Sequence, residues 1–128
     1  MSRLMSVAFT EQAVRDRTKT VTRRKGWEFA KAGDRITLCR KVMGRKKGEP
    51  LERIADVEIV SVRRERLDLM LTDLDYGFDE AQREGMGDTP GRFPSYFVEH
   101  YFVNAQGMSP DDEVTRIEWR YLDDEATR

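Results

Sequence analysis

A dense run of hydroxyl and basic side chains at residues 19–25, Lys-Thr-Val-Thr-Arg-Arg-Lys, holds the groups best suited to chemistry in this sequence. A threonine hydroxyl becomes a nucleophile only when a neighbour removes its proton, and a lysine accepts that proton only in its neutral form. In an extended segment Lys19 and Thr22 point to opposite sides, so only a bend would let the two side chains converge. The same run also suits an exposed edge strand, whose charges would protect it against aggregation.

Proton removal by Lys19 requires a large shift of its pKa. A free lysine titrates near ~10.4, and lowering the pKa to about 7.5 corresponds to roughly 4 kcal/mol of differential interaction. Burial and the neighbouring charges of Arg23 and Arg24 are able to supply a shift of this size. Arg24 or backbone amides would then stabilise a developing oxyanion.

The elements around this run must position it. Strands are predicted where apolar and polar residues alternate and β-branched residues are frequent. A stretch rich in Gly and Lys at residues 44–50 is typical of a loop or hairpin tip. The alternation predicts strands at residues 6–9, 18–24, 35–42, 54–62 and 114–122.

Helices are predicted from periodicity and from capping residues. Thr10 is placed to cap a helix over residues 11–17, and Asp79 to cap the second of two short helices or turns at 67–74 and 79–84. The strongest helical periodicity covers residues 93–105, where six side chains recur at helical spacing: Phe93, Tyr96, Phe97, His100, Tyr101 and Asn104.

The chain has 128 residues and a mass of 15.0 kDa, enough for one domain that buries roughly two-thirds of its unfolded surface. We therefore predict the α+β class, with a curved or closed mixed sheet of about five to six strands and two to four short helices. This single domain would cover residues 1–122, and the acidic residues 123–128 would form a frayed tail.

The charges are segregated along the chain, although the net charge is only −1. Residues 15–66 hold 17 Lys and Arg against 8 Asp and Glu, whereas residues 67–128 hold 5 against 15. A basic half within a neutral whole indicates an anionic partner, such as a nucleic acid or nucleotide, bound on one face. The alternative is that the two halves neutralise each other across the fold.

The sequence offers few metal ligands, since Cys39 and His100 are its single cysteine and histidine. We expect no metal, no cofactor and no Ser-His-Asp triad. Cys39 is interpreted as an inert thiol, and His100 as a packing or hydrogen-bonding residue of the aromatic helix. No apolar run approaches the ~20 residues that cross a bilayer, so we expect a cytoplasmic protein without a membrane partner.

These features resemble the opening of the ASCH domain, a small β-barrel family similar to the PUA RNA-binding fold. The likeness covers residues 5–122 and begins with Phe-Thr at 9–10, the run at 19–24 and Gly-Asp-Arg-Ile at 33–36. The family pattern Gly-x-Lys-x-x-Glu-x-Arg stands here as Arg-x-Lys-x-x-Thr-x-Arg at residues 17–24, with Arg in place of Gly and Thr in place of Glu. Within the family, the bacterial N(4)-acetylcytidine amidohydrolases also carry this threonine, in a similar Lys-Thr-x-Thr-x-Arg stretch.

The resemblance implies that Lys19, Thr22 and Glu84 are catalytic, with Glu80 as the rival for the carboxylate. Glu84 stands in Arg-Glu-Gly-Met at residues 83–86, ahead of the aromatic helix, as in short bacterial and phage-encoded ASCH proteins. A carboxylate beside Lys19 favours the charged ammonium, so the glutamate is better suited to orient the substrate amide or to pass a proton to the leaving amine.

Four further residues are predicted to bind the substrate or a nucleic acid. The cations Arg23, Arg24 and Lys41 would contact phosphate. Trp27 would stack on a base, although it could instead anchor the turn after Gly26.

The function favoured by the Lys-x-x-Thr arrangement is an amidohydrolase that removes an acyl group from the exocyclic amine of a modified cytidine nucleoside. The alternatives are an RNA-binding module of the PUA-like class, which grips phosphate without turnover, and an ASCH ribonuclease. The expected partner is therefore a modified nucleoside or RNA. We expect a monomer or weak dimer, in the host cytoplasm if the chain is phage-encoded.

Overall fold

The computed structural model describes residues 3–86 and 92–122, so the predicted tail at 123–128 lies outside the described residues. The amino-terminal half contains β1 (Arg3–Ser6), the 3-10 helix η1 (Ala8–Thr10), α1 (Glu11–Arg15), β2 (Val21–Arg24) and β3 (Arg35–Cys39). The remainder contains β4 (Arg53–Arg66), α2 (Leu69–Thr72), α3 (Leu74–Arg83), α4 (Pro94–Phe97), the π-helix η2 (Val98–Asn104) and β5 (Glu113–Tyr121).

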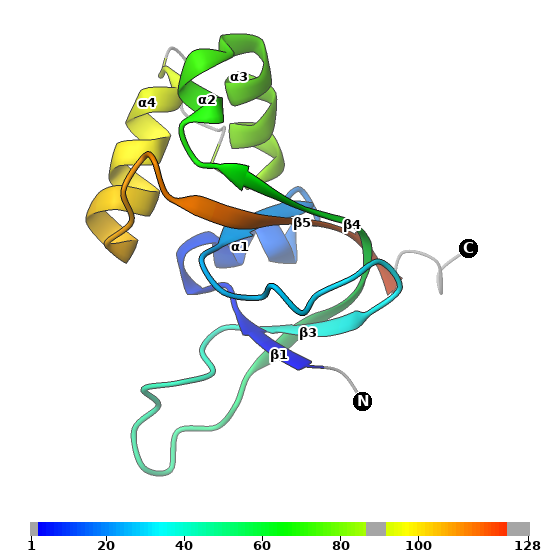
Figure 1. Ribbon diagram of the computed structural model, residues 1–128. Helices are drawn as coiled ribbons and strands as arrows, with labels where there is room; N and C mark the ends of the chain where they lie inside the picture. Colours follow the sequence, from blue (N-terminus) through cyan, green and yellow to red (C-terminus); the bar gives the residue numbers. More distant parts are fainter. Residues whose placement is uncertain (1–2, 87–91, 123–128) are drawn as a thin grey trace.

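The strands form one mixed sheet in the order β1-β3-β4-β5-β2, which confirms the predicted α+β class. β1 pairs in parallel with β3, and the other neighbours pair antiparallel. The long strand β4 changes register against β5 between Ile59 and Ser61, and such a bulge bends a strand. The sheet curls into a half-barrel whose open side lies between the edge strands β1 and β2 (Figure 1).

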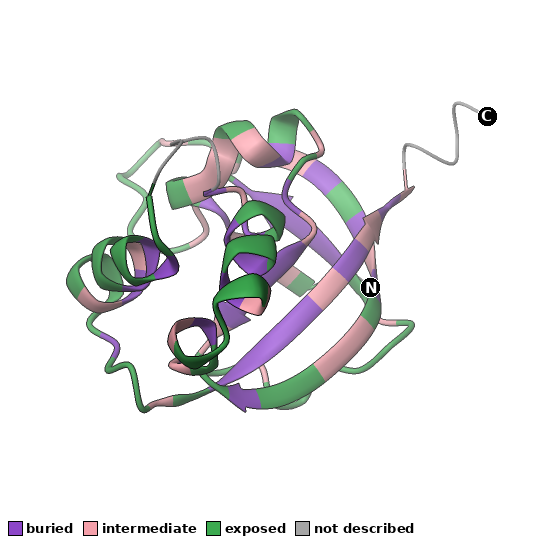
Figure 2. Cartoon of the chain, turned by 90° about the horizontal axis from the view of Figure 1, so that it is seen from above, coloured by how far each residue is buried: buried purple, intermediate pink, exposed green. Residues whose placement is uncertain are grey.

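Two apolar clusters hold the layers together. The first lies inside the half-barrel, and the second lies between the sheet and α2, α3 and α4; the outer surfaces of the helices are exposed (Figure 2). Members of the first include Met5, Ile36, Leu38, Val57, Ile117 and Trp119, and members of the second include Leu67, Met70, Phe97, Phe102 and Val114.

The predicted helix at 93–105 is present, but most of it is a π-helix rather than an α-helix. In a π-helix the hydrogen bonds join residues five apart, and Phe97 and Phe102, which have that spacing, are both buried. Of the residues at α-helical spacing, Phe97 is buried, whereas Phe93, Tyr96 and His100 are exposed. Phe102, which lies outside that spacing, is buried in their place. Tyr96 and His100 instead stack on each other at 5.5 Å on the outer side, which agrees with a packing role for His100.

Other predicted boundaries are wrong by a few residues. The first strand ends at Ser6, and Val7 enters the core where we expected the middle of a strand. The Thr10 side chain makes no capping hydrogen bond to α1. Asp73 rather than Asp79 caps α3, accepting a hydrogen bond from the Tyr76 backbone N–H at 3.1 Å.

None of the helices formed by the described residues has the length and apolar character needed to span a membrane. Within residues 3–86 and 92–122, no group of three or more His, Cys, Asp or Glu side chains is arranged to hold a metal ion.

Candidate active site

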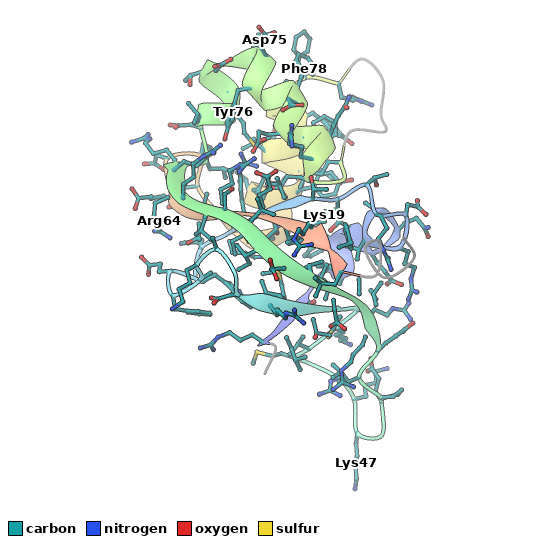
Figure 3. The ribbon with its side chains drawn as sticks, turned by 90° about the vertical axis from the view of Figure 1, so that its right-hand side faces the viewer. Lys19, Lys47, Arg64, Asp75, Tyr76 and Phe78 are labelled. Atoms are coloured by element: carbon teal, nitrogen blue, oxygen red, sulfur yellow. The ribbon has the colours of Figure 1, made fainter. Side chains whose placement is uncertain are left out.

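Lys19 is held in the irregular segment that joins α1 to β2. Its backbone N–H donates to the Ala13 carbonyl at 3.1 Å, and its carbonyl accepts hydrogen bonds from Trp119 Nε1 at 3.1 Å and from the Tyr121 hydroxyl. Because β5 supplies both of these buried donors, the last strand fixes the position of the Lys19 backbone. Figure 3 places the Lys19 side chain in the interior of the molecule, close to where the strands meet α3.

The Lys19 ammonium meets the carboxyl end of α3. Nζ donates to the Glu84 carbonyl at 2.8 Å and to Glu84 Oε1 at 3.1 Å, and both side chains are almost fully buried. The Thr20 backbone N–H donates to the Arg83 carbonyl at 2.8 Å, so the same segment satisfies two carbonyls at the helix end. These hydrogen bonds connect Lys19 and Glu84, which are 65 residues apart in the sequence.

Gly85 makes this approach possible. The Met86 N–H donates to the Ala81 carbonyl and the Gly85 N–H to the Gln82 carbonyl, which is the Schellman arrangement at a helix end. Gly85 adopts a φ of 87°, and a Cβ at this position would lie 2.5 Å from Ala13 Cβ and 3.3 Å from Lys19 Cβ. The Glu-Gly pair noted in the sequence thus has a structural reason in the packing of α3 against Lys19.

We expect Gly85→Ala to destabilise the protein by about 2–4 kcal/mol, because the left-handed backbone and an overpacked contact each carry a penalty. Urea denaturation would measure the change. Gly26→Ala is the matched control, since no atom lies within 4 Å of a Cβ there and its φ is not left-handed. A loss at Gly85 no larger than the loss at Gly26 would contradict the close approach.

Thr22 reaches the same region from β2. Its Oγ1 accepts a hydrogen bond from Arg24 Nε at 3.1 Å, while Arg24 Nη2 donates to the Ser6 carbonyl at 2.6 Å. Arg24 therefore links the two edge strands across the open side of the half-barrel. Because Oγ1 is the acceptor in its bond with Arg24, the hydroxyl proton of Thr22 is left for another partner.

Lys19, Thr22, Arg24 and Glu84 line one pocket, which we call the lysine pocket. It encloses about 90 Å³, room for an acylated amine and part of a ring. Arg23 and Met86 also line it. The rest of its wall comes from the end of β1, from η1, from the π-helix and from the residues just after it: Ser6, Val7, Ala8, Phe9, Thr10, Tyr101, Phe102 and Gln106. The bend before β2 thus brings Lys19 and Thr22 to the same cavity, as the sequence required for joint action.

The electrostatics of the lysine pocket lower the pKa of Lys19. Burial is the largest influence and lowers the pKa of Lys19; the charge of Glu84 opposes this, and the charge of Arg24 adds to it. A neutral amine has two N–H donors and one lone pair. Glu84 accepts two hydrogen bonds from Nζ, so the lone pair of the neutral form is free to accept a proton.

Arg23, which also lines the lysine pocket, belongs to a buried ion network. Its guanidinium donates to Glu84 Oε2 and Glu65 Oε2, both at 3.0 Å, and to Glu80 Oε1. The side chain is 0% exposed. Arg23 therefore holds carboxylates in place, and its guanidinium faces protein groups where the sequence suggested a phosphate.

Glu80, the rival carboxylate, is not among the residues that line the lysine pocket and belongs to this network. It accepts from Arg116 Nε at 2.5 Å and from Arg116 Nη2 at 3.0 Å, besides its bond with Arg23. Burial alone would raise the pKa of Glu80, but the hydrogen bonds from Arg116 and the charge of Arg23 lower it to about 2. Glu84, and not Glu80, is the carboxylate that lines the pocket.

The structure places the two remaining predicted binding residues elsewhere. Trp27 lines a separate pocket beyond the end of β2. Lys41 lies at the base of the loop between β3 and β4 and pairs with Glu49 at 3.6 Å. Cys39 is buried in β3, and burial raises the pKa of its thiol, which fits an inert side chain.

Neutralisation between the basic and acidic halves accounts for part of the segregated charge. Lys19 pairs with Glu84, and Arg23 pairs with both Glu80 and Glu84, all in the interior. On the surface Lys25 pairs with Asp112 at 3.5 Å. For these pairs, the basic and acidic halves of the sequence therefore neutralise each other across the fold, as the alternative interpretation of the charge pattern predicted.

Sequence reasoning missed Glu65 and Tyr76, two residues that hold the Arg23 guanidinium in place. Glu65 and Tyr76 bond to Arg23, and Tyr76 Oη also donates to Glu65 Oε1 at 2.8 Å. These residues come from β4 and α3, and no local spacing connects them to β2. Glu65 lies three residues beyond the predicted strand end, in a run of charged residues at 63–66 that gave no signal of its burial.

The sequence matches no protein-family model and no curated protein. The fold resembles the crystal structure of protein EF3133 from Enterococcus faecalis V583, assigned to the family DUF984. The two chains align with a TM-score of 0.54, covering 95% of this chain and 80% of that one at 15% sequence identity. At this identity the likeness establishes a shared fold and leaves activity to be argued from the site.

Proposed function

We propose that this protein is an amidohydrolase that removes the acetyl group from N(4)-acetylcytidine or a similar acylated cytidine. The observation that carries the proposal is the lysine pocket, in which a buried lysine of lowered pKa shares one cavity with a threonine hydroxyl and a glutamate. The resemblance of residues 17–24 to the ASCH amidohydrolases supports the same assignment. The small size of the pocket suits an acylated amine at its base.

In the first half of the reaction, neutral Lys19 takes the proton of Thr22 as Oγ1 attacks the acetyl carbonyl carbon. The bond from that carbon to the exocyclic nitrogen then breaks, and the Lys19 ammonium returns the proton to the leaving amine. Cytidine departs and the acetyl group remains on Thr22. In the second half, water attacks the ester carbonyl carbon and gives a proton to Lys19. The bond from that carbon to Thr22 Oγ1 breaks, Lys19 returns the proton to Oγ1, and acetic acid leaves and ionises to acetate.

Glu84 and Arg24 have supporting roles in this scheme. Glu84 holds Nζ through two hydrogen bonds, which fixes the direction of its lone pair. Arg24 donates to Thr22 Oγ1 at 3.1 Å and therefore stabilises negative charge that develops on that oxygen. Arg24 stays cationic despite burial, because a guanidinium is not deprotonated in proteins.

The decisive test is incubation of the purified full-length protein with N(4)-acetylcytidine, followed by chromatographic separation of cytidine and acetate. We expect the two products in equal amounts and at a rate proportional to protein concentration. The Lys47→Ala variant is the control, because Lys47 lies at the tip of the loop between β3 and β4, far from Lys19 (Figure 3), and its rate should be unchanged. Absence of both products with RNA binding that weakens steeply as salt rises would favour the RNA-binding module instead.

A further inference from the structure

A second pocket, larger than the lysine pocket, lies beyond the end of β2. It encloses about 300 Å³ and contains an aromatic pair, Trp27 and Phe29, whose ring centroids are 5.2 Å apart. Ile36 and Ile59 contribute apolar surface to its lining. We call it the tryptophan pocket. Phe29 is 53% exposed, so its ring is accessible from the solvent.

Three cations surround this aromatic pair. Arg3 places its guanidinium carbon 4.1 Å from the centre of the Phe29 ring, and Lys31 and Arg35 also line the tryptophan pocket. Within residues 3–86 and 92–122, none of these three cations forms an ion pair, in contrast to the paired cations around Arg23. The one acid in the lining is Asp34, so the pocket carries an excess of positive charge.

The backbone at Trp27 is strained. Its φ is 65°, a left-handed conformation that is rare for a bulky side chain and typically carries a penalty of about 1–3 kcal/mol. Such strain concentrates at ligand-binding positions. Here it orients an indole beside Phe29 within the cationic pocket, where a planar aromatic ligand with a negative charge would fit.

The two pockets lie at opposite ends of the open side of the half-barrel. Ser6 at one end of β1 lines the lysine pocket, and Arg3 at the other end lines the tryptophan pocket. The four-residue strand spans about 10 Å between them, which corresponds to roughly three nucleotides of a stacked strand at ~3.4 Å each. Arg24, which makes no ion pair within the described ranges, bridges β2 to β1 along this path.

We propose that the tryptophan pocket binds a nucleobase of single-stranded RNA while an acetylated cytidine of the same strand occupies the lysine pocket. Trp27 and Phe29 stack on the base, and Arg3, Lys31 and Arg35 contact the adjacent phosphates. The preferred substrate is therefore a polymer rather than a free nucleoside. This inference rests on the proposed amide hydrolysis for the reaction, whereas the base-binding site itself does not.

The first experiment measures binding alone, by fluorescence anisotropy of a labelled five-nucleotide oligocytidine RNA that carries no acetyl group. We expect Phe29→Ala to bind this RNA about tenfold more weakly than wild type, because the substitution removes one ring on which a base stacks. Lys47→Ala is the control and should bind within twofold of wild type. Equal binding by Phe29→Ala and wild type, or no binding at all, would overturn the base-binding site.

The second experiment compares kcat/KM for N(4)-acetylcytidine as a nucleoside and within the same RNA. We expect the RNA to be preferred about tenfold by wild type and to lose that preference in Phe29→Ala, with nucleoside turnover unchanged. If wild type binds the RNA more tightly than Phe29→Ala does but turns over neither substrate, the amidohydrolase is disproved and the base-binding site still stands. Turnover of nucleoside and RNA at equal rates, or binding of cytidine monophosphate as tight as that of the RNA, would disprove the polymeric substrate.

Discussion

Replacing Lys19 with methionine should lower kcat for N(4)-acetylcytidine roughly a thousandfold while the protein remains folded. General-base catalysis contributes about 10²–10⁴-fold to rate, and a thioether cannot accept the Thr22 proton. Methionine has a similar length and no charge, so it fits the buried position, and Glu84 keeps its bond to Arg23 at 3.0 Å. Steady-state kinetics with circular dichroism on the same samples would measure both properties.

Two further substitutions separate the role of base from that of charge or shape. Lys19→Arg keeps a cation that cannot deprotonate, so it should be as inactive as Lys19→Met if the lysine acts as a base. Thr22→Val removes the hydroxyl at nearly constant volume and should abolish turnover, whereas Thr22→Ser keeps a nucleophile and should retain activity. An active Thr22→Val protein would remove the threonine from the mechanism, and an active Lys19→Arg protein would assign the lysine an electrostatic role.

The pH profile of the wild-type enzyme tests the same protonation state. Only neutral Lys19 accepts a proton, so kcat/KM should rise with pH and level off above the pKa of Lys19. Burial lowers that pKa, with Glu84 opposing and Arg24 and Arg23 assisting, so the plateau should begin below the ~10.4 of a free lysine. Activity that falls as pH rises through this range would contradict a neutral base.

The strands were largely predictable, because their signals are local. Alternation of β-branched and polar residues located β3, β4 and β5, since each needs only a neighbour on one face to bury its apolar side. The π-helix was not predictable from periodicity. Its register depends on Phe97 and Phe102 both reaching the cluster formed with Leu67 and Val114, which is a property of the assembled fold.

The candidate site divides in the same way. Lys19 and Thr22 are three residues apart, so the sequence alone shows that they belong together once the chain bends. Glu84 was identified through the resemblance, and the structure places it in the same pocket because Gly85 lets α3 approach Lys19. Arg23 looked like a residue for binding phosphate, since a sequence does not show that three carboxylates converge on one guanidinium.

Removing the Arg23 guanidinium should destabilise the protein strongly, because three buried carboxylates converge on it. We expect Arg23→Met to lower the free energy of unfolding by about 3–5 kcal/mol, because buried carboxylates lose a cationic partner. Glu80 keeps Arg116 and Glu84 keeps Lys19, so the network is weakened rather than abolished. Urea denaturation monitored by tryptophan fluorescence would measure the loss.

Arg64→Met is the control for charge removal. Arg64 lies on β4 (Figure 3), pairs with Glu113 at 3.2 Å and is one-third exposed, so its loss should lower stability by less than about 1 kcal/mol. A similar loss for both variants would mean that the convergence of carboxylates on Arg23 carries no special weight in the fold.

The pH dependence of this loss identifies its electrostatic origin. In the wild type the pKa of Glu80 is lowered to about 2, so the stability that its charge contributes is present above its ordinary pKa and is lost as pH falls toward 2. Without Arg23 the folded carboxylates bind protons more readily than in the wild type, so the deficit of Arg23→Met should be largest at neutral pH and shrink in acid. A deficit that stays constant between pH 7 and pH 3 would instead assign the loss to packing, because removal of buried volume does not depend on protonation.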